Sequence, residues 1–121
     1  MEGQVHEFKE KFPIEQRKSE SDRILKKHPN RIPIIIEKAK TSKNVEDIDK
    51  KKFLVPGDLT MGQLMYVVRK RIKNVSAETG LFFFINNTMP PTGEILNQIY
   101  AKHKDEDGFL YVHYTGENTF G

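Results

Sequence analysis

The fold of this chain depends most on the stretch TMGQLMYVVRKRIK, residues 60–73, which is the clearest helix in the sequence. Its apolar residues recur at i, i+3, i+4, i+7 and i+11, which is the spacing of one helix face: Met61, Leu64, Met65, Val68 and Ile72. Thr60 and Gln63 are spaced as a capping box, in which two side chains bind unpaired backbone N–H groups. The basic residues near its end stabilise the negative end of the helix dipole. The stretch therefore predicts an amphipathic helix that covers one face of a sheet.

The segments on either side of this helix predict four strands and one more helix. β-Branched and aromatic residues favour strands at residues 31–38, 51–55, 81–85 and 109–114. A further helix is expected at residues 93–102. A hairpin, a crossover helix, two strands and a second helix make the β-grasp, or ubiquitin-like, arrangement. We therefore predict an α+β fold with a four-stranded mixed sheet.

Two additional helices are predicted before the sheet, at residues 5–12 and 14–27, and they carry few apolar residues: Val5, Phe8, Phe12, Ile24 and Leu25. They are expected to lie on the sheet face that the central helix leaves open. The chain is thus predicted to be one domain over residues 1–121. It is divided into a helical extension (1–28), a β-grasp core (31–114) and a flexible C-terminal tail (115–121).

Composition narrows the class of function. The chain has 121 residues and no cysteine, so it has neither disulfides nor a thiolate nucleophile. No signal peptide or membrane span is evident, and a reducing compartment, cytosol or nucleus, is expected. Residues 1–52 carry fourteen basic and ten acidic residues, whereas residues 53–121 carry six and seven. This modest, alternating charge is typical of solvated helices and does not favour a nucleic-acid partner.

No residues have the pattern of a catalytic or metal site. His6, His28, His103 and His113 lack metal-ligand spacing and are interpreted as surface or helix-end residues. The acidic residues 105–107 lack the spacing of a calcium loop and are interpreted as a solvated turn. No nucleophile elbow or phosphate-binding loop is present. We therefore predict a protein that is not an enzyme and that uses no cofactor or metal.

The alternation of side chains along the strands predicts a binding slot. Pro33 cannot donate a ladder hydrogen bond, so its strand is expected at a sheet edge. The second sheet face has only the sparse helix at 14–27 to cover it. This leaves an apolar pocket floored by Pro33, Ile35, Leu54, Ile24 and Phe109. Such a pocket beside a strand edge accepts an extended peptide. The competing interpretation is that these residues all belong to the core.

The last residue is the second functional signal. Gly121 follows a short polar stretch, and a glycine lacks the Cβ that would obstruct access to its carboxylate. This favours activation and conjugation of the C-terminal carboxylate, and a disordered terminus is the alternative. Nothing follows Gly121 in the sequence, and two readings stay open: a processed form, or a chain that needs no priming cleavage.

Seven segments together closely resemble the autophagy ubiquitin-like modifiers of the GABARAP and microtubule-associated-protein light-chain family: residues 30–33, 36–39, 49–56, 82–87, 90–92, 104–111 and 114–121. The resemblance implies cleavage by a cysteine protease to expose the terminal glycine. It further implies transfer by activating and conjugating enzymes to phosphatidylethanolamine on the autophagosome. The lipid-linked form would recruit cargo receptors and adaptors through aromatic-x-x-aliphatic motifs, and the unlinked form is expected to be cytoplasmic.

The resemblance also implies two peptide pockets, position by position. The pocket for the aromatic residue corresponds to Glu20, Ile24, Arg31, Pro33, Ile35, Lys52, Leu54 and Phe109. The pocket for the aliphatic residue corresponds to Phe53, Val55, Pro56, Leu59, Leu64 and Val67. Residues 82–84 correspond to a second docking surface of the family. Strand alternation predicts part of the first pocket but assigns the second to the core.

Two other classes of function remain as alternatives. One is an unconjugated trafficking or cytoskeletal adaptor that uses the basic N-terminal helices. The other is a nucleic-acid-binding module, which predicts a steep salt dependence of oligonucleotide binding.

Overall fold

The computed structural model describes residues 6–76 and 78–116, and within these ranges it contains four helices and four strands. Their bounds in chain order are α1 (Glu7–Lys11), α2 (Ile14–Lys27), β1 (Arg31–Lys38), β2 (Lys52–Pro56), α3 (Met61–Arg71), β3 (Phe82–Phe84), α4 (Leu96–His103) and β4 (Leu110–Thr115). Every predicted strand and helix is present, with ends that differ by a few residues. No helix of the described residues is long and apolar enough to cross a membrane.

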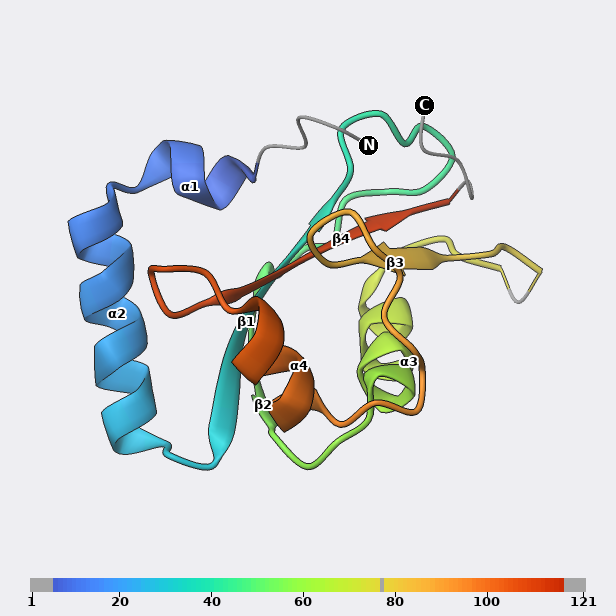
Figure 1. The fold of residues 1–121 in the computed structure, drawn as a ribbon. Coiled ribbons are helices and arrows are strands. Elements are labelled where there is room, and N and C mark those ends of the chain that lie inside the picture. Colours follow the sequence, from blue (N-terminus) through green and yellow to red (C-terminus); the bar gives the residue numbers. More distant parts are fainter. Residues whose placement is uncertain (1–5, 77, 117–121) are drawn as a thin grey trace.

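The four strands form one mixed sheet in the order β2-β1-β4-β3. β1 pairs antiparallel with β2 and parallel with β4, and β3 pairs antiparallel with β4. The sheet therefore has the predicted β-grasp topology, with the two sequence-distant strands β1 and β4 side by side at its centre (Figure 1).

The two faces of the sheet bury different side chains, as strand alternation predicts. Ile32, Ile34 and Ile36 point into the larger core with residues of α3 and α4, among them Met61 and Leu96, which are fully buried. The opposite face holds a smaller cluster of Phe8, Ile35, Phe109 and Tyr111, with Phe12 and Ile24 packed against it. Figure 1 shows α1 and α2 on one side of the sheet and α3 and α4 on the other. The N-terminal helices thus cover the face that α3 leaves open.

The predicted edge position of β1 is wrong, because β1 lies between β2 and β4. The N–H of Ile36 donates to the Lys51 carbonyl, so every second residue of β1 bonds to β2. Pro33 falls on the alternate positions, where a backbone nitrogen points toward β4. The pairing with β4 begins only at Ile34, which lies opposite Leu110. The proline nitrogen therefore lies just before the ladder begins, and no ladder hydrogen bond is lost.

The capping box at the start of α3 is confirmed. The N–H of Gln63 donates to the Thr60 hydroxyl at 3.1 Å, and the N–H of Thr60 donates to the Gln63 side chain at 2.9 Å. The last helix begins at Leu96, three residues later than the sequence predicts. Residues 93–95, which were expected to form its first turn, instead run beside the start of α3, where Thr60 and Ile95 form a β-bridge. Backbone bonds to a neighbouring segment replace the bonds of a helical turn there.

Candidate functional site

The residues assigned to the aromatic pocket lie together between α2 and the hairpin of β1 and β2. Pro33 lies opposite Leu54 and Ile35 lies opposite Lys52 in the antiparallel register. These pairs fall between the hydrogen-bonded positions, where side chains of neighbouring strands come closest. Ile24 of α2 packs on the cluster that contains Ile35 and Phe109. Side chains that strand alternation assigned to one pocket, among them Ile35, Ile24 and Phe109, are therefore also neighbours in the tertiary structure.

The floor of this slot is filled by the protein's own side chains. Ile35 and Phe109 are fully buried, and the Phe8 ring lies with its centroid 5.4 Å from that of Phe109. Ile24 and Leu54 are only partly buried, so the accessible apolar surface is confined to the rim between α2 and β2.

An ion pair crosses the slot at this rim. The ammonium of Lys52 on β2 donates to the carboxylate of Glu20 on α2, with 43% and 21% of the two side chains exposed. The same ammonium lies 5.9 Å from the centroid of the Phe8 ring. Two of the three charged residues assigned to the aromatic pocket, Lys52 and Glu20, are therefore bound to each other above its apolar floor.

The outer edge of β2 is open, because β2 is the terminal strand of the sheet. The Lys51 carbonyl bonds to β1, and in an antiparallel pair every second residue bonds to the neighbouring strand. The backbone N–H and C=O groups of Lys52 and Leu54 therefore point away from β1. Arg31 is exposed at this end of the hairpin and donates to the Leu54 carbonyl at 3.3 Å. No other strand of residues 6–76 and 78–116 pairs with this edge.

The residues assigned to the aliphatic pocket divide between core and surface. Phe53, Val55 and Leu64 belong to the larger core, with exposures of 7%, 7% and 0%. Leu59 is partly buried, and Pro56 and Val67 are exposed. Only these last three offer apolar surface, which agrees with the strand alternation that assigned Phe53 and Val55 to the core.

The predicted conjugation residue Gly121 lies outside the described residues. The expected tail of 115–121 begins too early, because Thr115 is the last residue of β4 and is 1% exposed. The N–H of Gly116 donates to the Ser42 hydroxyl at 3.0 Å. The body of the domain thus holds the chain at least as far as Gly116.

The acidic residues 105–107 are not a solvated turn, because Asp107 is fully buried. One of its oxygens accepts hydrogen bonds from Arg17 of α2 and from the Tyr111 hydroxyl, each at 2.5 Å. The other oxygen accepts from the N–H of Phe109 at 2.8 Å. Burial and the adjoining carboxylate raise the pKa of Tyr111, so its phenol remains a donor. The turn therefore anchors α2 beside the slot.

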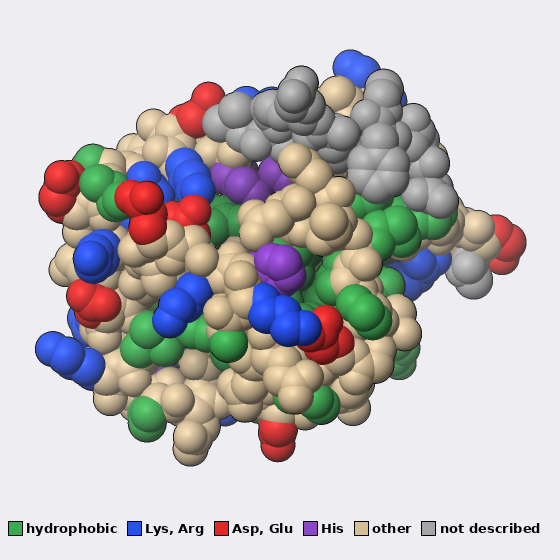
Figure 2. Space-filling view, viewed as in Figure 1, with side chains coloured by type: hydrophobic (Ala, Val, Ile, Leu, Met, Phe, Trp, Pro, Cys, Tyr) green, Lys and Arg blue, Asp and Glu red, His purple; other side chains and the backbone are tan. Residues whose placement is uncertain are grey.

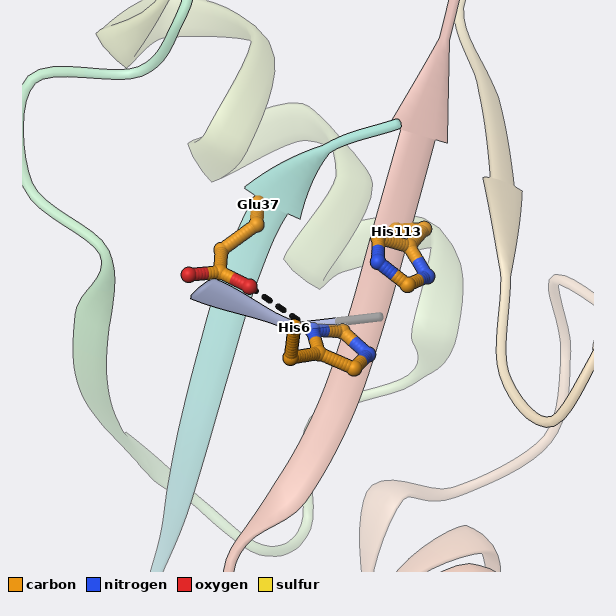
Figure 3. A group of neighbouring side chains, drawn as sticks. All are labelled: His6, Glu37 and His113. Carbon is orange, nitrogen blue, oxygen red and sulfur yellow. Dashed lines mark hydrogen bonds and ion pairs between the residues drawn. The ribbon is translucent and has the colours of Figure 1, made fainter. Parts of the chain in front are cut away.

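A polar cluster that sequence spacing does not reveal lies where α1 begins. His6 precedes α1, and its Nδ1 lies 2.8 Å from the Glu37 carboxylate on β1 (Figure 3). The second Glu37 oxygen accepts from the N–H of Phe8 at 3.0 Å. The His6 ring stacks on His113 of β4, with centroids 3.7 Å apart and planes at 11°. His113 is 7% exposed within a strand, so its interpretation as a surface or helix-end residue is wrong.

The surroundings of Glu37 in this cluster lower the pKa of its carboxyl group. Burial raises its pKa, but the hydrogen bond from His6, the nearby Lys51 and the Phe8 N–H together hold the pKa below its ordinary value.

Figure 2 shows histidine side chains gathered on one face of the molecule, among acidic and basic side chains. Only one signal in the sequence could have indicated this cluster: polar residues in strands that otherwise read as apolar.

Comparison with known proteins gives one consistent result. The family model described as autophagy protein Atg8, ubiquitin-like, matches residues 16–121. The chain is 61% identical to autophagy-related protein 8a of Arabidopsis thaliana over 114 residues, covering 94% of this chain and 92% of that protein. It is 58% identical to autophagy-related protein 8 of Kluyveromyces lactis, with 94% and 90% covered.

Two solved structures share the fold. The crystal structure of Trypanosoma brucei ATG8 superposes with a TM-score of 0.88 at 44% identity, covering 97% of this chain and 99% of that chain. Plasmodium falciparum Atg8, in complex with a Plasmodium falciparum Atg3 peptide, superposes with a TM-score of 0.86 at 35% identity, covering 96% and 100%.

Proposed function

This chain belongs to the Atg8 family of ubiquitin-like autophagy proteins, and on that premise we propose that it is a conjugated modifier and peptide-binding adaptor, not an enzyme. Gly121 is the residue joined to phosphatidylethanolamine, and the lipid-linked protein recruits receptors to the autophagosomal membrane. The unlinked protein is cytoplasmic. The observation that carries the peptide-binding part is the open edge of β2 beside the half-covered slot.

The edge of β2 supplies backbone hydrogen bonds to an extended peptide. Backbone groups of Lys52 and Leu54 face away from β1, so a peptide strand that adds to the sheet there pairs with them. Strand addition of this kind draws affinity from the main chain and specificity from alternate side chains. Arg31 is exposed beside the edge and favours a peptide with acidic residues next to its motif.

An aromatic peptide side chain enters the slot by parting Lys52 from Glu20. An ion pair this exposed stabilises a protein by no more than about 1 kcal/mol. Burying one aromatic ring contributes roughly 4–6 kcal/mol gross, at about 25 cal/mol per Å². The apolar gain therefore exceeds the loss of the pair, and the displaced ammonium is left near the acidic flank of the peptide.

The aliphatic residue of the motif packs against the surface formed by Pro56, Leu59 and Val67. These side chains are exposed or partly exposed, whereas Phe53 and Leu64 belong to the core cluster against which Leu59 packs. The role of Leu64 and Phe53 is thus to position the wall of this pocket, with little direct contact.

Conjugation requires enzymes that recognise the folded body. The Plasmodium falciparum relative holds an Atg3 peptide, which supports a conjugating enzyme as a partner of this chain too. An activating enzyme, a processing cysteine protease and motif-bearing autophagy receptors complete the proposed set of partners. No nucleic acid is among them.

Isothermal titration with an aromatic-x-x-aliphatic peptide tests the peptide site. Leu54→Ala removes part of the slot rim and is expected to weaken binding by about 1–3 kcal/mol. Met89→Ala is the matched control, because Met89 is 49% exposed and follows β3, at the far end of the sheet from β2. Equal affinity of wild type and Leu54→Ala would refute the proposed site.

A lysate supplied with ATP tests conjugation. Gly121→Ala should abolish the faster-migrating, lipid-bearing species, and an undiminished lipid band would count against conjugation at this residue. The unconjugated adaptor makes the reverse prediction. Under that alternative, deletion of residues 1–12 removes the main partner, whereas Gly121→Ala has no effect.

A further inference from the structure

Three side chains of the kinds that bind transition metals converge where α1 begins. His6, Glu37 and His113 lie far apart in the sequence, and the parallel register places Glu37 directly opposite His113. One nitrogen of each imidazole and one carboxylate oxygen all lie within 4.8 Å of one another. In Figure 3 the three side chains project toward a common space between α1, β1 and β4.

We propose that His6, Glu37 and His113 bind one divalent transition-metal ion, with Zn²⁺ as the representative, and that the ion fastens the start of α1 to the sheet. Imidazole nitrogen and carboxylate oxygen are ordinary ligands of Zn²⁺, which takes four of them in tetrahedral geometry. Three come from the protein here, and water supplies the fourth. None of these three residues is assigned to the proposed peptide pockets.

The electrostatics of the cluster suit a bound cation. The side chains of Glu37 and His6 are only 5% and 11% exposed, so solvent screens their donor atoms weakly. Two ammonium groups lie nearby, and each is already paired with a carboxylate. Lys51 bonds to Glu7 as well as lying 3.4 Å from Glu37. Lys9 bonds to Asp105. The charges of Lys51 and Lys9 are therefore each balanced by a carboxylate before a cation binds.

Metal binding requires one ring to turn. The two imidazoles lie face to face, so no ion can lie in the plane of both. The torsion that turns an imidazole has a broad energy profile, so the main cost of the rotation is the loss of the stacking contact. The hydrogen bond between His6 and one Glu37 oxygen is then exchanged for two bonds to the metal. The other Glu37 oxygen keeps the N–H of Phe8, which orients the carboxylate as outer hydrogen bonds do in metal sites.

An entry path leads to the imidazoles. A cavity of about 170 Å³ is lined by His6, His113 and His103, by Asn86 and Asn87, by the paired Lys9 and Asp105, and by Tyr111. Its polar walls accommodate a hydrated ion. His103 lines the same cavity but does not belong to the group of three, and this makes it a matched control.

Titration of the full-length protein with Zn²⁺ against a chromophoric chelator at neutral pH tests the site. Wild type is expected to bind one equivalent. Loss of an outer hydrogen-bond partner costs a metal site about 10- to 100-fold in affinity, so loss of a direct ligand in His6→Gln or His113→Gln should cost more than about 100-fold. His103→Gln should bind as wild type does. Circular dichroism checks that each variant is folded. His6→Gln, at the helix start, serves if His113→Gln fails to fold.

Imidazole resonances in NMR spectra give a readout that does not depend on affinity. Zn²⁺ should shift the signals of His6 and His113 and leave His28 unchanged. Absence of binding, equal binding by His6→Gln and wild type, or loss of binding only in His103→Gln would each overturn the proposal. Lipid conjugation through Gly121 and peptide affinity are unaffected by these outcomes, so the two proposals fail separately.

Discussion

Replacing Asp107 by alanine should destabilise the domain far more than replacing the adjacent acidic residue Glu106. Asp107 is fully buried and bonds to Arg17 and Tyr111 at 2.5 Å and to the N–H of Phe109 at 2.8 Å. Its removal leaves the guanidinium of Arg17, whose side chain is 10% exposed, without its counter-charge. It also leaves the Tyr111 hydroxyl without its acceptor.

The expected magnitude follows from the loss of one member of a buried pair, which costs about 3–5 kcal/mol. A domain of this size has a free energy of unfolding of roughly 6–18 kcal/mol, at about 0.05–0.15 kcal/mol per residue. Asp107→Ala therefore remains folded in the absence of denaturant but loses a large share of its stability. Urea unfolding followed by circular dichroism measures the loss, with an unchanged slope as the check that only stability has changed.

Glu106→Ala is the matched control, because Glu106 is the adjacent acidic residue and is exposed. It should change the free energy of unfolding by no more than about 0.5 kcal/mol. The double variant Arg17→Met/Asp107→Asn should recover part of the loss, since no unpaired charge is then buried. A loss below about 1 kcal/mol in Asp107→Ala would refute the view that this turn anchors α2.

Two further predictions concern the same end of the sheet. Gly108→Ala should lower the midpoint temperature of thermal unfolding, because Gly108 has φ +93° and an added Cβ would lie 2.3 Å from the Ser21 hydroxyl. Gly93→Ala is the control, because its Cβ meets nothing within 4 Å, and it should lower the midpoint much less. Equal shifts of the midpoint in the two variants would contradict the reasoning. Burial raises the pKa of Asp105, but the bond from Lys9 and its charge outweigh this and hold the pKa below its ordinary value. A depressed carboxyl pKa gives stability that is present above the unfolded-state pKa and lost as the pH falls through the folded-state value. The free energy of unfolding of wild type should therefore exceed that of Lys9→Ala by up to about 1 kcal/mol at neutral pH. The two values should be equal once the pH is well below about 4. A difference that persists in acid would exclude the ion pair as its cause.

Local patterns were sufficient for the elements and for the orientation of their faces. The capping residues and apolar stripe of residues 60–73 predicted α3, and the alternation of Ile32, Ile34 and Ile36 against Ile35 predicted which side chains enter each core. These signals are short-range, because helix and strand periodicities are properties of neighbouring residues. The part of the peptide slot that lies on one hairpin could be predicted for the same reason.

Contacts between segments that are distant in the sequence could not be predicted from these local periodicities. Pro33 indicated an edge strand, yet β4 pairs with β1 from Ile34 onward, where Ile34 lies opposite Leu110, 76 residues later in the sequence. Asp107 looked like a surface residue until α2 supplied Arg17. The resemblance to a known family supplied the aliphatic pocket, which periodicity had assigned to the core.

The order of residues alone predicted a four-stranded β-grasp and two helices on the second face of its sheet. It also led to the expectation that Gly121 is the site of conjugation. Which polar side chains meet in the interior was settled only when β1 and β4 came together and α1 and α2 packed across them. The contacts of His6 with Glu37 and His113 span many residues of sequence, and no local spacing encodes them. A buried polar group is stable only if a partner reaches it, and the packing of distant segments decides whether one does.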